Sequence, residues 1–167
     1  MQGGVQAGQR GAMGQQAGPS TRGVQLRSIQ LAEVSRSEVV EVQPDESITD
    51  VVVRMADEDV GSVVVSEDGE PIGILTDRKI ALSMAEQPDV ADRTAGDLVD
   101  GGIVSATEDT TVYEAIQRLR DEGIRRLPIV DDDGNLQGIV TLDDLLVLVA
   151  GELGAIAEVI ESQAPPR

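Results

Sequence analysis

The sequence LPIVDDDGNLQGIVTLDD, residues 127–144, contains two short apolar runs separated by a polar turn and followed by the start of a helix. Both runs are rich in β-branched residues, which favour strands. Gly134 in the turn can adopt the positive φ that a tight hairpin requires. Thr141 stands three residues before Asp144, so a hydroxyl can cap the helix and a carboxylate can lie near the positive end of its dipole. The stretch therefore predicts strand, hairpin, strand and helix.

The same pattern occurs earlier in the chain, over residues 61–79. Three equivalent pairs are each 65 positions apart: Gly69 and Gly134, Gly73 and Gly138, and Thr76 and Thr141. A constant offset over matching motifs indicates an internal repeat.

An amphipathic helix is predicted ahead of the strand pair in both copies. The i, i+3, i+4, i+7 spacing of its apolar residues is repeated at an offset of 64: Ile48, Val51, Val52 and Met55, then Val112, Ala115, Ile116 and Leu119. Ser47 and Thr111 stand three residues before a carboxylate, as in a capping box. The change of offset predicts that the second copy gained one residue between the helix and the strand pair. Residues 39–42 and 103–106 give each copy a leading strand.

Each copy is thus expected to be β-α-β-β-α, and this order with its G-x-x-T motif resembles the CBS domain family, named after cystathionine β-synthase. Two copies in tandem resemble a Bateman module. The resemblance implies an α+β or α/β fold in which two repeats pack about a pseudo-two-fold axis. It also implies clefts between the repeats that commonly bind adenine nucleotides or related adenosyl ligands. We expect these boundaries: a disordered Gly/Gln-rich tail at 1–30, repeats at 31–86 and 95–150, a linker at 87–94, and a C-terminal helix and tail at 151–167.

The resemblance further implies a short lead-in helix before each leading strand, packed on its own repeat, over residues 31–37 and 95–101. The linker is short, so the two repeats are not expected to move independently.

Ligand contacts in the family come from the leading strand, the start of the next strand and the G-x-x-T-x-x-D turn. The second repeat has matching residues at all three places: Ile103, Val104, Ser105, Arg125, Arg126, Thr141 and Asp144. Guanidinium groups can bind phosphate oxygens bidentately, and a carboxylate can accept both ribose hydroxyls. The alternative is that the two arginines form a solvated basic spot and that Asp144 only caps a helix.

The first repeat departs from the motif, and its cleft is expected to bind more weakly. Its matching positions are Gly61, Ser62, Thr76, Arg78 and Lys79. A lysine cannot accept hydrogen bonds from a ribose, although Arg78 and Lys79 can attract phosphate.

The composition excludes several classes of function. The net charge of −18 and the pI of about 4.1 argue against nucleic acid as a partner. The chain lacks cysteine and histidine, so we expect no catalytic residues, no metal site and no required cofactor, and hence no enzyme. An acidic surface with one lysine is typical of proteins from salt-accumulating haloarchaea, the alternative being an ordinary acidic cytosolic protein. No membrane span or signal peptide is predicted, so the expected location is cytoplasmic.

Both ends of the chain carry further expectations. Residues 1–23 have no apolar periodicity and are predicted to be disordered. They form either a basic tail, which would bind an anionic partner or fold back on the chain's own acidic surface, or an unselected extension, with Met13 as an internal start. From Leu145 to Ile160 the chain is strongly apolar. We expect this surface to meet a second subunit in a homodimer, the alternative being burial against the lead-in segment of the same chain.

The favoured function is a stand-alone regulatory module. It would bind an adenine nucleotide (AMP, ADP or ATP) or a related adenosyl ligand and signal to an effector protein through the conformation of its dimer. The alternative is a scaffold or dimerisation protein whose clefts have lost ligand binding. Lys79 in place of a carboxylate favours this alternative, whereas Thr141, Asp144 and the two arginines argue against it.

Overall fold

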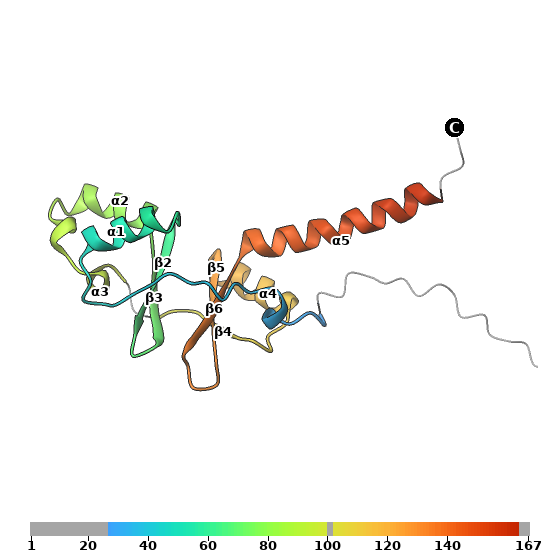
Figure 1. The fold of residues 1–167 in the computed structure, drawn as a ribbon, viewed down its shortest axis with the longest axis horizontal. Coiled ribbons are helices and arrows are strands. Elements are labelled where there is room, and N and C mark those ends of the chain that lie inside the picture. The colour runs from blue at the N-terminus through green and yellow to red at the C-terminus, as the bar shows by residue number, and fades with distance from the viewer. Residues whose placement is uncertain (1–26, 100–101, 164–167) are drawn as a thin grey trace, which may run out of the picture.

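The computed structural model describes residues 27–99 and 102–163. These residues form two three-stranded sheets that lie side by side, each with its own helices (Figure 1). The expected disorder of residues 1–23 lies outside the described residues.

The first repeat has the predicted order of elements. Its sheet has the order β1-β2-β3, with β1 parallel and β3 antiparallel to β2. The elements are β1 (Glu41–Val42), α1 (Ile48–Asp57), β2 (Ser62–Glu67), β3 (Glu70–Thr76) and α2 (Asp77–Glu86).

The second repeat has the same order and the same pairing, β4-β5-β6. Its elements are β4 (Ala106–Thr107), α4 (Val112–Glu122), β5 (Arg126–Val130), β6 (Leu136–Thr141) and α5 (Leu142–Ser162). The β-α-β-β-α prediction is therefore confirmed for both copies. The leading strands are shorter than expected, because Ile103–Ser105 form no strand and β4 keeps only Ala106 of the predicted segment.

The predicted hydroxyl caps begin the helices of both repeats. The Ser47 hydroxyl accepts a hydrogen bond from the Asp50 amide at 3.1 Å, and the Thr76 hydroxyl accepts one from the Lys79 amide at 3.0 Å. Thr111 and Glu114 form a complete capping box, since the Glu114 carboxylate accepts from the Thr111 amide at 2.9 Å.

The extra residue of the second copy lies in its hairpin, not between the helix and the strand pair. The first leading strand pairs Val42 with Val65, and the second pairs Ala106 with Ile129. Both members of the second pair are 64 positions after their equivalents in the first. In the hairpins, Val65 pairs with Gly73 and Ile129 pairs with Gly138, and these two glycines are 65 positions apart. An insertion ahead of a strand would turn its apolar side chains to the opposite face, whereas a loop absorbs one without that change.

The two hairpin loops differ accordingly. The first turn has two residues, Asp68 and Gly69, with φ of 52° and 92°. The second loop spans residues 131–135, and Gly134 has the predicted positive φ, at 91°. The two loops touch, because the Leu136 amide donates to the Gly69 carbonyl at 2.9 Å.

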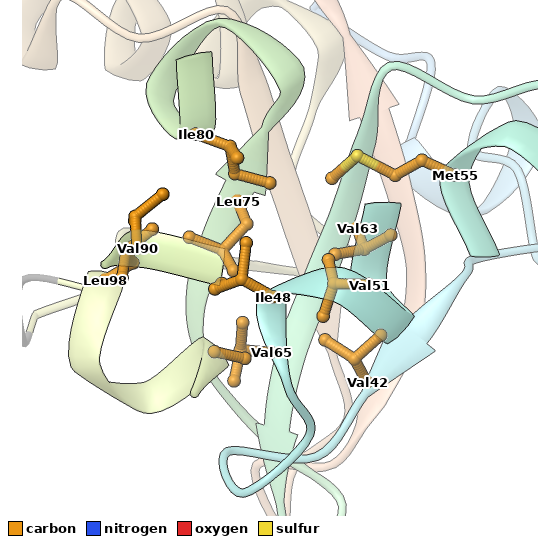
Figure 2. Packing of buried hydrophobic residues seen from close by; sticks show 11 residues of the cluster. Val42, Ile48, Val51, Met55, Val63, Val65, Leu75, Ile80, Val90 and Leu98 are labelled. Carbon is orange, nitrogen blue, oxygen red and sulfur yellow. The ribbon is translucent and has the colours of Figure 1, made fainter. Parts of the chain in front are cut away.

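Each sheet packs against its helices through an aliphatic core. In the first repeat, side chains from β1, β2, β3, α1 and α2 converge, together with Val90 and Leu98 (Figure 2). Val90 belongs to the short helix η2 (Val90–Asp92), and Leu98 ends α3 (Ala95–Leu98). The linker and second lead-in therefore contribute to the core of the first repeat.

The first lead-in segment packs on the second repeat in the same way. Leu31, in the short helix η1 (Leu31–Glu33), is fully buried in the core of the second repeat. The Leu31 amide donates to the Thr110 carbonyl at 2.9 Å, and the Arg36 amide donates to the Ile139 carbonyl at 3.0 Å. Arg27 lies over the ring of Tyr113, 4.2 Å from its centroid.

The lead-in segments are thus exchanged, and the expectation that each packs on its own repeat is wrong. The Ala95 amide donates to the Glu46 carbonyl at 2.8 Å, which ties the second lead-in to the first repeat. Residues 38–40 form no regular element, so the chain can cross from one repeat to the other before β1 begins (Figure 1). This exchange couples the two repeats.

Helix α5 runs through Gly151 and Gly154 without interruption and projects beyond the two sheets (Figure 1). Its first turns join the second core, where Leu145 is buried and Leu148 packs against the same cluster that contains Leu31. Beyond them, Leu153 and Ile160 are 58% and 66% exposed, so the lead-in segment covers only the start of the helix. Within the described ranges, no helix combines the length and apolar character needed to cross a membrane.

Candidate functional site

In the part of the chain that the structure describes, two clefts are lined by residues of both repeats. The first, which we call the Thr141 cleft, has a volume of about 280 Å³. It is formed by the first leading segment, the start of β2, and the end of β6. Its lining residues are Arg36, Glu38, Val39, Val40, Val60, Gly61, Ser62, Val63, Val64, Arg126, Ile139, Thr141 and Asp143.

The second, which we call the Lys79 cleft, has a volume of about 180 Å³. It is formed by the second leading segment, the start of β5, and the end of β3 with the start of α2. Its lining residues are Gly73, Ile74, Lys79, Val99, Gly102, Ile103, Val104, Ile124 and Arg126. The lining that the structure describes is apolar apart from two cationic side chains, Lys79 and Arg126.

The structure does not bring the predicted second-repeat residues together in one site. Thr141 lines one cleft, whereas Ile103 and Val104 line the other, and Arg126 lines both. Gly61 and Ser62, predicted for the weaker cleft, lie in the Thr141 cleft. The reason is the exchange of the lead-in segments, which places the leading segment of one repeat beside the last strand of the other.

The remaining predicted residues lie at the margins. The Arg125 side chain is 69% exposed and 3.7 Å from the Asp143 carboxylate. The Ser105 carbonyl accepts a hydrogen bond from the Arg118 guanidinium at 2.6 Å. Arg78 lies beside Thr76 and Lys79 in a shallow pocket along α2, outside both clefts.

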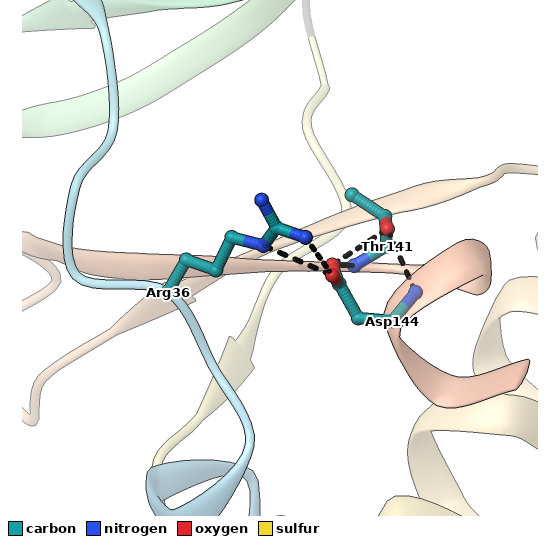
Figure 3. A network of polar contacts seen from close by, with 3 residues as sticks. All are labelled: Arg36, Thr141 and Asp144. Atoms are coloured by element: carbon teal, nitrogen blue, oxygen red, sulfur yellow. Dashed lines mark hydrogen bonds and ion pairs between the residues drawn. The ribbon is translucent and has the colours of Figure 1, made fainter. Parts of the chain in front are cut away.

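Asp144 is not among the lining residues of the Thr141 cleft, but both of its carboxylate oxygens contact residues that are, Thr141 and Arg36 (Figure 3). Its Oδ2 accepts from the Thr141 amide at 3.0 Å and from the Thr141 hydroxyl at 2.6 Å. Its Oδ1 accepts from Arg36 Nε at 2.9 Å and Nη2 at 2.6 Å. The side chain of Asp144 is only 12% exposed, although that of Arg36 is 70% exposed.

The pKa of Asp144 reflects two opposing effects. Burial raises the pKa of this carboxyl, but the hydrogen bonds from Thr141 and Arg36 together lower it further than burial raises it. The pKa therefore lies below its ordinary value, and Asp144 is a carboxylate at neutral pH. Asp144 also takes part in the helix cap, since its amide donates to the Thr141 hydroxyl at 3.2 Å.

Arg36 is a cleft residue that the sequence analysis missed. It belongs to the first lead-in segment, which was assigned to the first repeat and so was not considered beside Asp144. One sequence signal could have found it. Arg36 and Asp144 match Asp100 and Lys79 in the other copy, where the charges are reversed. Asp100 lies outside the described residues.

The crossing of each lead-in segment to the other repeat explains why the G-x-x-T motif begins with glycine. The backbone of Arg36 pairs with that of Ile139, directly beside Gly138. A Cβ at Gly138 would lie 2.8 Å from the Arg36 carbonyl oxygen, closer than real Cβ contacts allow. At Gly73 a Cβ would overlap the Val99 side chain of the second lead-in. Each motif glycine therefore makes room for the exchanged segment.

A pair of arginines on equivalent helices supports the leading segments. Arg54 on α1 donates to the Glu41 carbonyl at 2.8 Å, and Arg118 on α4 donates to the Ser105 carbonyl at 2.6 Å. Both pairs have a separation of 13 positions, so the contact is repeated in the two copies. These contacts position the backbone that lines the clefts.

Comparison with known proteins agrees with this architecture. The family model for the CBS domain matches residues 31–86 and 95–151. An uncharacterized protein of Methanopyrus kandleri is 41% identical over 123 residues, which is 72% of this chain and 63% of that protein. The chain therefore spans slightly less than two thirds of that relative.

Two solved structures have the same fold at lower sequence identity. The CBS domain pair of protein MJ0100, in complex with 5′-methylthioadenosine and S-adenosyl-L-methionine, has a TM-score of 0.66 at 21% identity, with 74% of this chain and 97% of that chain covered. CBSX2 in complex with AMP has a TM-score of 0.63 at 23% identity, with the same coverage. The internal repeat, the exchanged lead-in segments and the two family matches lead to one conclusion: the chain belongs to the CBS domain family, as a tandem pair.

Proposed function

We propose that this chain is a regulatory module that binds an adenine nucleotide or a related adenosyl ligand in the Thr141 cleft. The observation that carries the proposal is the ionised Asp144 beside the Thr141 hydroxyl, at the edge of a cleft whose walls come from both repeats. The ligands of protein MJ0100 and of CBSX2 share an adenosyl group, and these proteins have the same fold.

Each part of an adenosyl ligand has a suitable chemical environment here. The Asp144 carboxylate can accept hydrogen bonds from the ribose hydroxyls. Val39, Val40 and Ile139 provide apolar surface for the base. Arg126 can attract a phosphate, and the N-terminus of α5 adds a favourable dipole. We expect one dominant site for each chain.

The Lys79 cleft serves as the weaker site in this proposal. Lys79 matches Asp144 in the repeat, and it cannot accept hydrogen bonds from ribose hydroxyls. Its two cations and apolar walls suit a ligand that has several phosphates more than a nucleoside. Binding at this cleft should therefore depend strongly on phosphate number and on ionic strength.

Signalling is proposed to pass through a homodimer formed by α5. Five apolar residues of this helix follow the alternating three- and four-residue spacing of a coiled-coil seam: Leu146, Val149, Leu153, Ile156 and Ile160. Four of them are exposed and Val149 is half-buried. The proposal includes a cytoplasmic, non-catalytic protein with no required cofactor and an effector protein that responds to the ligand.

A scaffold that binds no ligand is the second candidate, and one observation favours it. The carboxylate of Asp144 already has four donors from Thr141 and Arg36, which satisfies it without any ligand. The two candidates differ in their response to adenosyl compounds.

A thermal-shift screen with adenosine, AMP, ADP, ATP and S-adenosylmethionine separates these candidates, with GMP as a control for the base. A ligand that binds only the folded chain raises its thermal midpoint, and the stabilisation grows with the logarithm of one plus the ratio of ligand concentration to Kd. A rise with adenosyl compounds and not with GMP supports the sensor. If the thermal midpoint rises with none of them, at concentrations up to several millimolar, the scaffold is favoured over the sensor.

A further inference from the structure

The acceptor capacity of Asp144 is fully used inside the chain. A carboxylate offers about four lone-pair positions, two on each oxygen. On Oδ2 both are taken by Thr141, through its amide and its hydroxyl, and these contacts are part of the helix cap. On Oδ1 both are taken by Arg36, through Nε and Nη2. A ribose diol can therefore reach Asp144 only by displacing one of these partners.

Of the two partners, Arg36 is the one that can leave. The Thr141 contacts are local, within one helical turn, and they satisfy a backbone amide that would otherwise lack a partner. The Arg36 side chain comes from a segment 108 positions away and is 70% exposed, so its guanidinium can return to water. When Arg36 leaves, its guanidinium regains hydration, and the ribose hydroxyls then satisfy the mostly buried carboxylate oxygen.

Arg36 also connects the cleft to the exchanged lead-in segment. Its backbone forms both hydrogen bonds of a bridge to Ile139, each at 3.0 Å. Five residues earlier, Leu31 is fully buried in the second core. The segment is thus held at its backbone and at Leu31 whether or not the Arg36 side chain contacts Asp144, and loss of the ion pair frees the side chain without unfolding the segment.

We infer that Arg36 is an internal competitor for the ribose site: its guanidinium occupies Asp144 Oδ1 in the ligand-free chain, and the hydroxyls of an adenosyl ligand replace it. This inference rests on the proposed function. Arg36 thereby sets the affinity of the cleft, because the measured Kd is the intrinsic Kd divided by the fraction of chains whose Asp144 is open.

The other copy has a lysine at the position that matches Asp144. At the positions that match Arg36 and Asp144, the sequence has Asp100 and Lys79, with the signs reversed. Lys79 has donors only, so ribose hydroxyls that donate to Asp144 have no acceptor to donate to on Lys79. We therefore expect competition of this kind at the Thr141 cleft.

The test is calorimetric titration of the full chain and of Arg36→Gln with adenosine and with 2′,3′-dideoxyadenosine. Both probes are uncharged, so loss of the arginine charge does not itself alter their attraction to the cleft. Arg36→Gln should bind adenosine about two- to fivefold more tightly than the unmodified chain, which corresponds to the upper part of the range for an ion pair with an exposed member. The dideoxy compound lacks the diol and should show less than half of that gain.

The matched control is Arg120→Gln. Arg120 is 67% exposed and pairs with Asp121 on the surface of α4, away from both clefts. This variant changes the net charge by the same amount and should bind adenosine as the unmodified chain does.

A second measurement does not depend on any variant. The Nε–H resonance of Arg36 should be protected from solvent exchange in the ligand-free chain and should lose this protection when adenosine is added. Persistent protection in the bound state would overturn the inference.

The titrations separate failure of the inference from failure of the proposed function. If adenosine binds the unmodified chain, and binds Arg36→Gln equally or more weakly, Arg36 is not a competitor and the site still stands. If adenosine binds neither chain, the proposed function fails and the inference fails with it. Binding to Arg36→Gln alone would support both.

Discussion

At the residue scale, Asp144 and Gly138 explain why the G-x-x-T-x-x-D motif has these residues in this order. The glycine admits the backbone of the exchanged lead-in segment, which brings Arg36 to the end of the motif. The threonine begins α5 and binds one oxygen of Asp144, which leaves the other oxygen to face Arg36. One short motif therefore joins segments from both ends of the chain.

The first residue-scale prediction concerns Gly138→Ala. Its Cβ would lie 2.8 Å from a backbone oxygen, so a segment must shift, and we expect a loss of about 1–3 kcal/mol of unfolding free energy. Gly151→Ala is the control, because no atom lies within 4 Å of its Cβ position on helix α5. Alanine there should stabilise the chain by up to about 1 kcal/mol. Chemical denaturation measures both, and equal effects would contradict the close approach.

The second residue-scale prediction is a pH dependence. The pKa of Asp144 in the folded chain lies below its ordinary value of 3.8, so its ionised form stabilises the fold above that pH. This contribution disappears as the pH falls through the lower, folded-state pKa. The unmodified chain should therefore have a higher thermal midpoint than Asp144→Asn at pH 7, and the difference should shrink below about pH 4. A difference that grows on acidification would contradict the assignment.

At the element scale, the repeat order was predictable and the exchange of lead-in segments was not. Strand pairs, helices and hydroxyl caps follow from local patterns such as Thr111 before Glu114, and these were confirmed. Leu31 and Val34 are apolar residues of a short segment, and their sequence neighbours do not specify which of two similar cores they enter. For the same reason the candidate residues were assigned to the wrong clefts. Thr141 and Ile103 belong to one repeat, but they line different clefts.

The element-scale prediction concerns the seam of α5. Leu153→Glu and Ile156→Glu place a charge where a second copy would bury an apolar side chain, so each should convert a dimer to a monomer. Val147→Glu is the control, because Val147 is 73% exposed and lies outside the three- and four-residue spacing. Light scattering over a concentration series measures the mass. A monomer in the unmodified chain would remove the dimer from the proposal.

At the scale of the whole molecule, charge is the dominant feature. A net charge of −18 on 167 residues opposes the compact state through self-repulsion. The cores are aliphatic, and the two repeats are coupled by their exchanged lead-in segments. Composition predicted this repulsion, but it could not predict where the few cations would lie, and Arg36, Arg54 and Arg118 all bind the chain itself.

The whole-molecule prediction is stabilisation by salt. Between 0.1 M and 1 M salt the Debye length falls from about 10 Å to about 3 Å, which screens repulsion between the acidic side chains. The thermal midpoint should therefore rise over this range in KCl, and raising the KCl further to about 2 M should keep it high. Circular dichroism measures the midpoint. A midpoint that falls with KCl would contradict adaptation to high salt.

Asp144, beside the Thr141 cleft, is proposed to bind the ribose of an adenosyl ligand. Calorimetric titration of AMP into the unmodified chain, Asp144→Asn and Lys79→Ala tests this assignment. Asp144→Asn should lose about 1–3 kcal/mol of binding free energy, or roughly five- to 150-fold in affinity, whereas Lys79→Ala should change it little. Equal losses would mean that both clefts bind AMP, and unchanged affinity in Asp144→Asn would contradict the account.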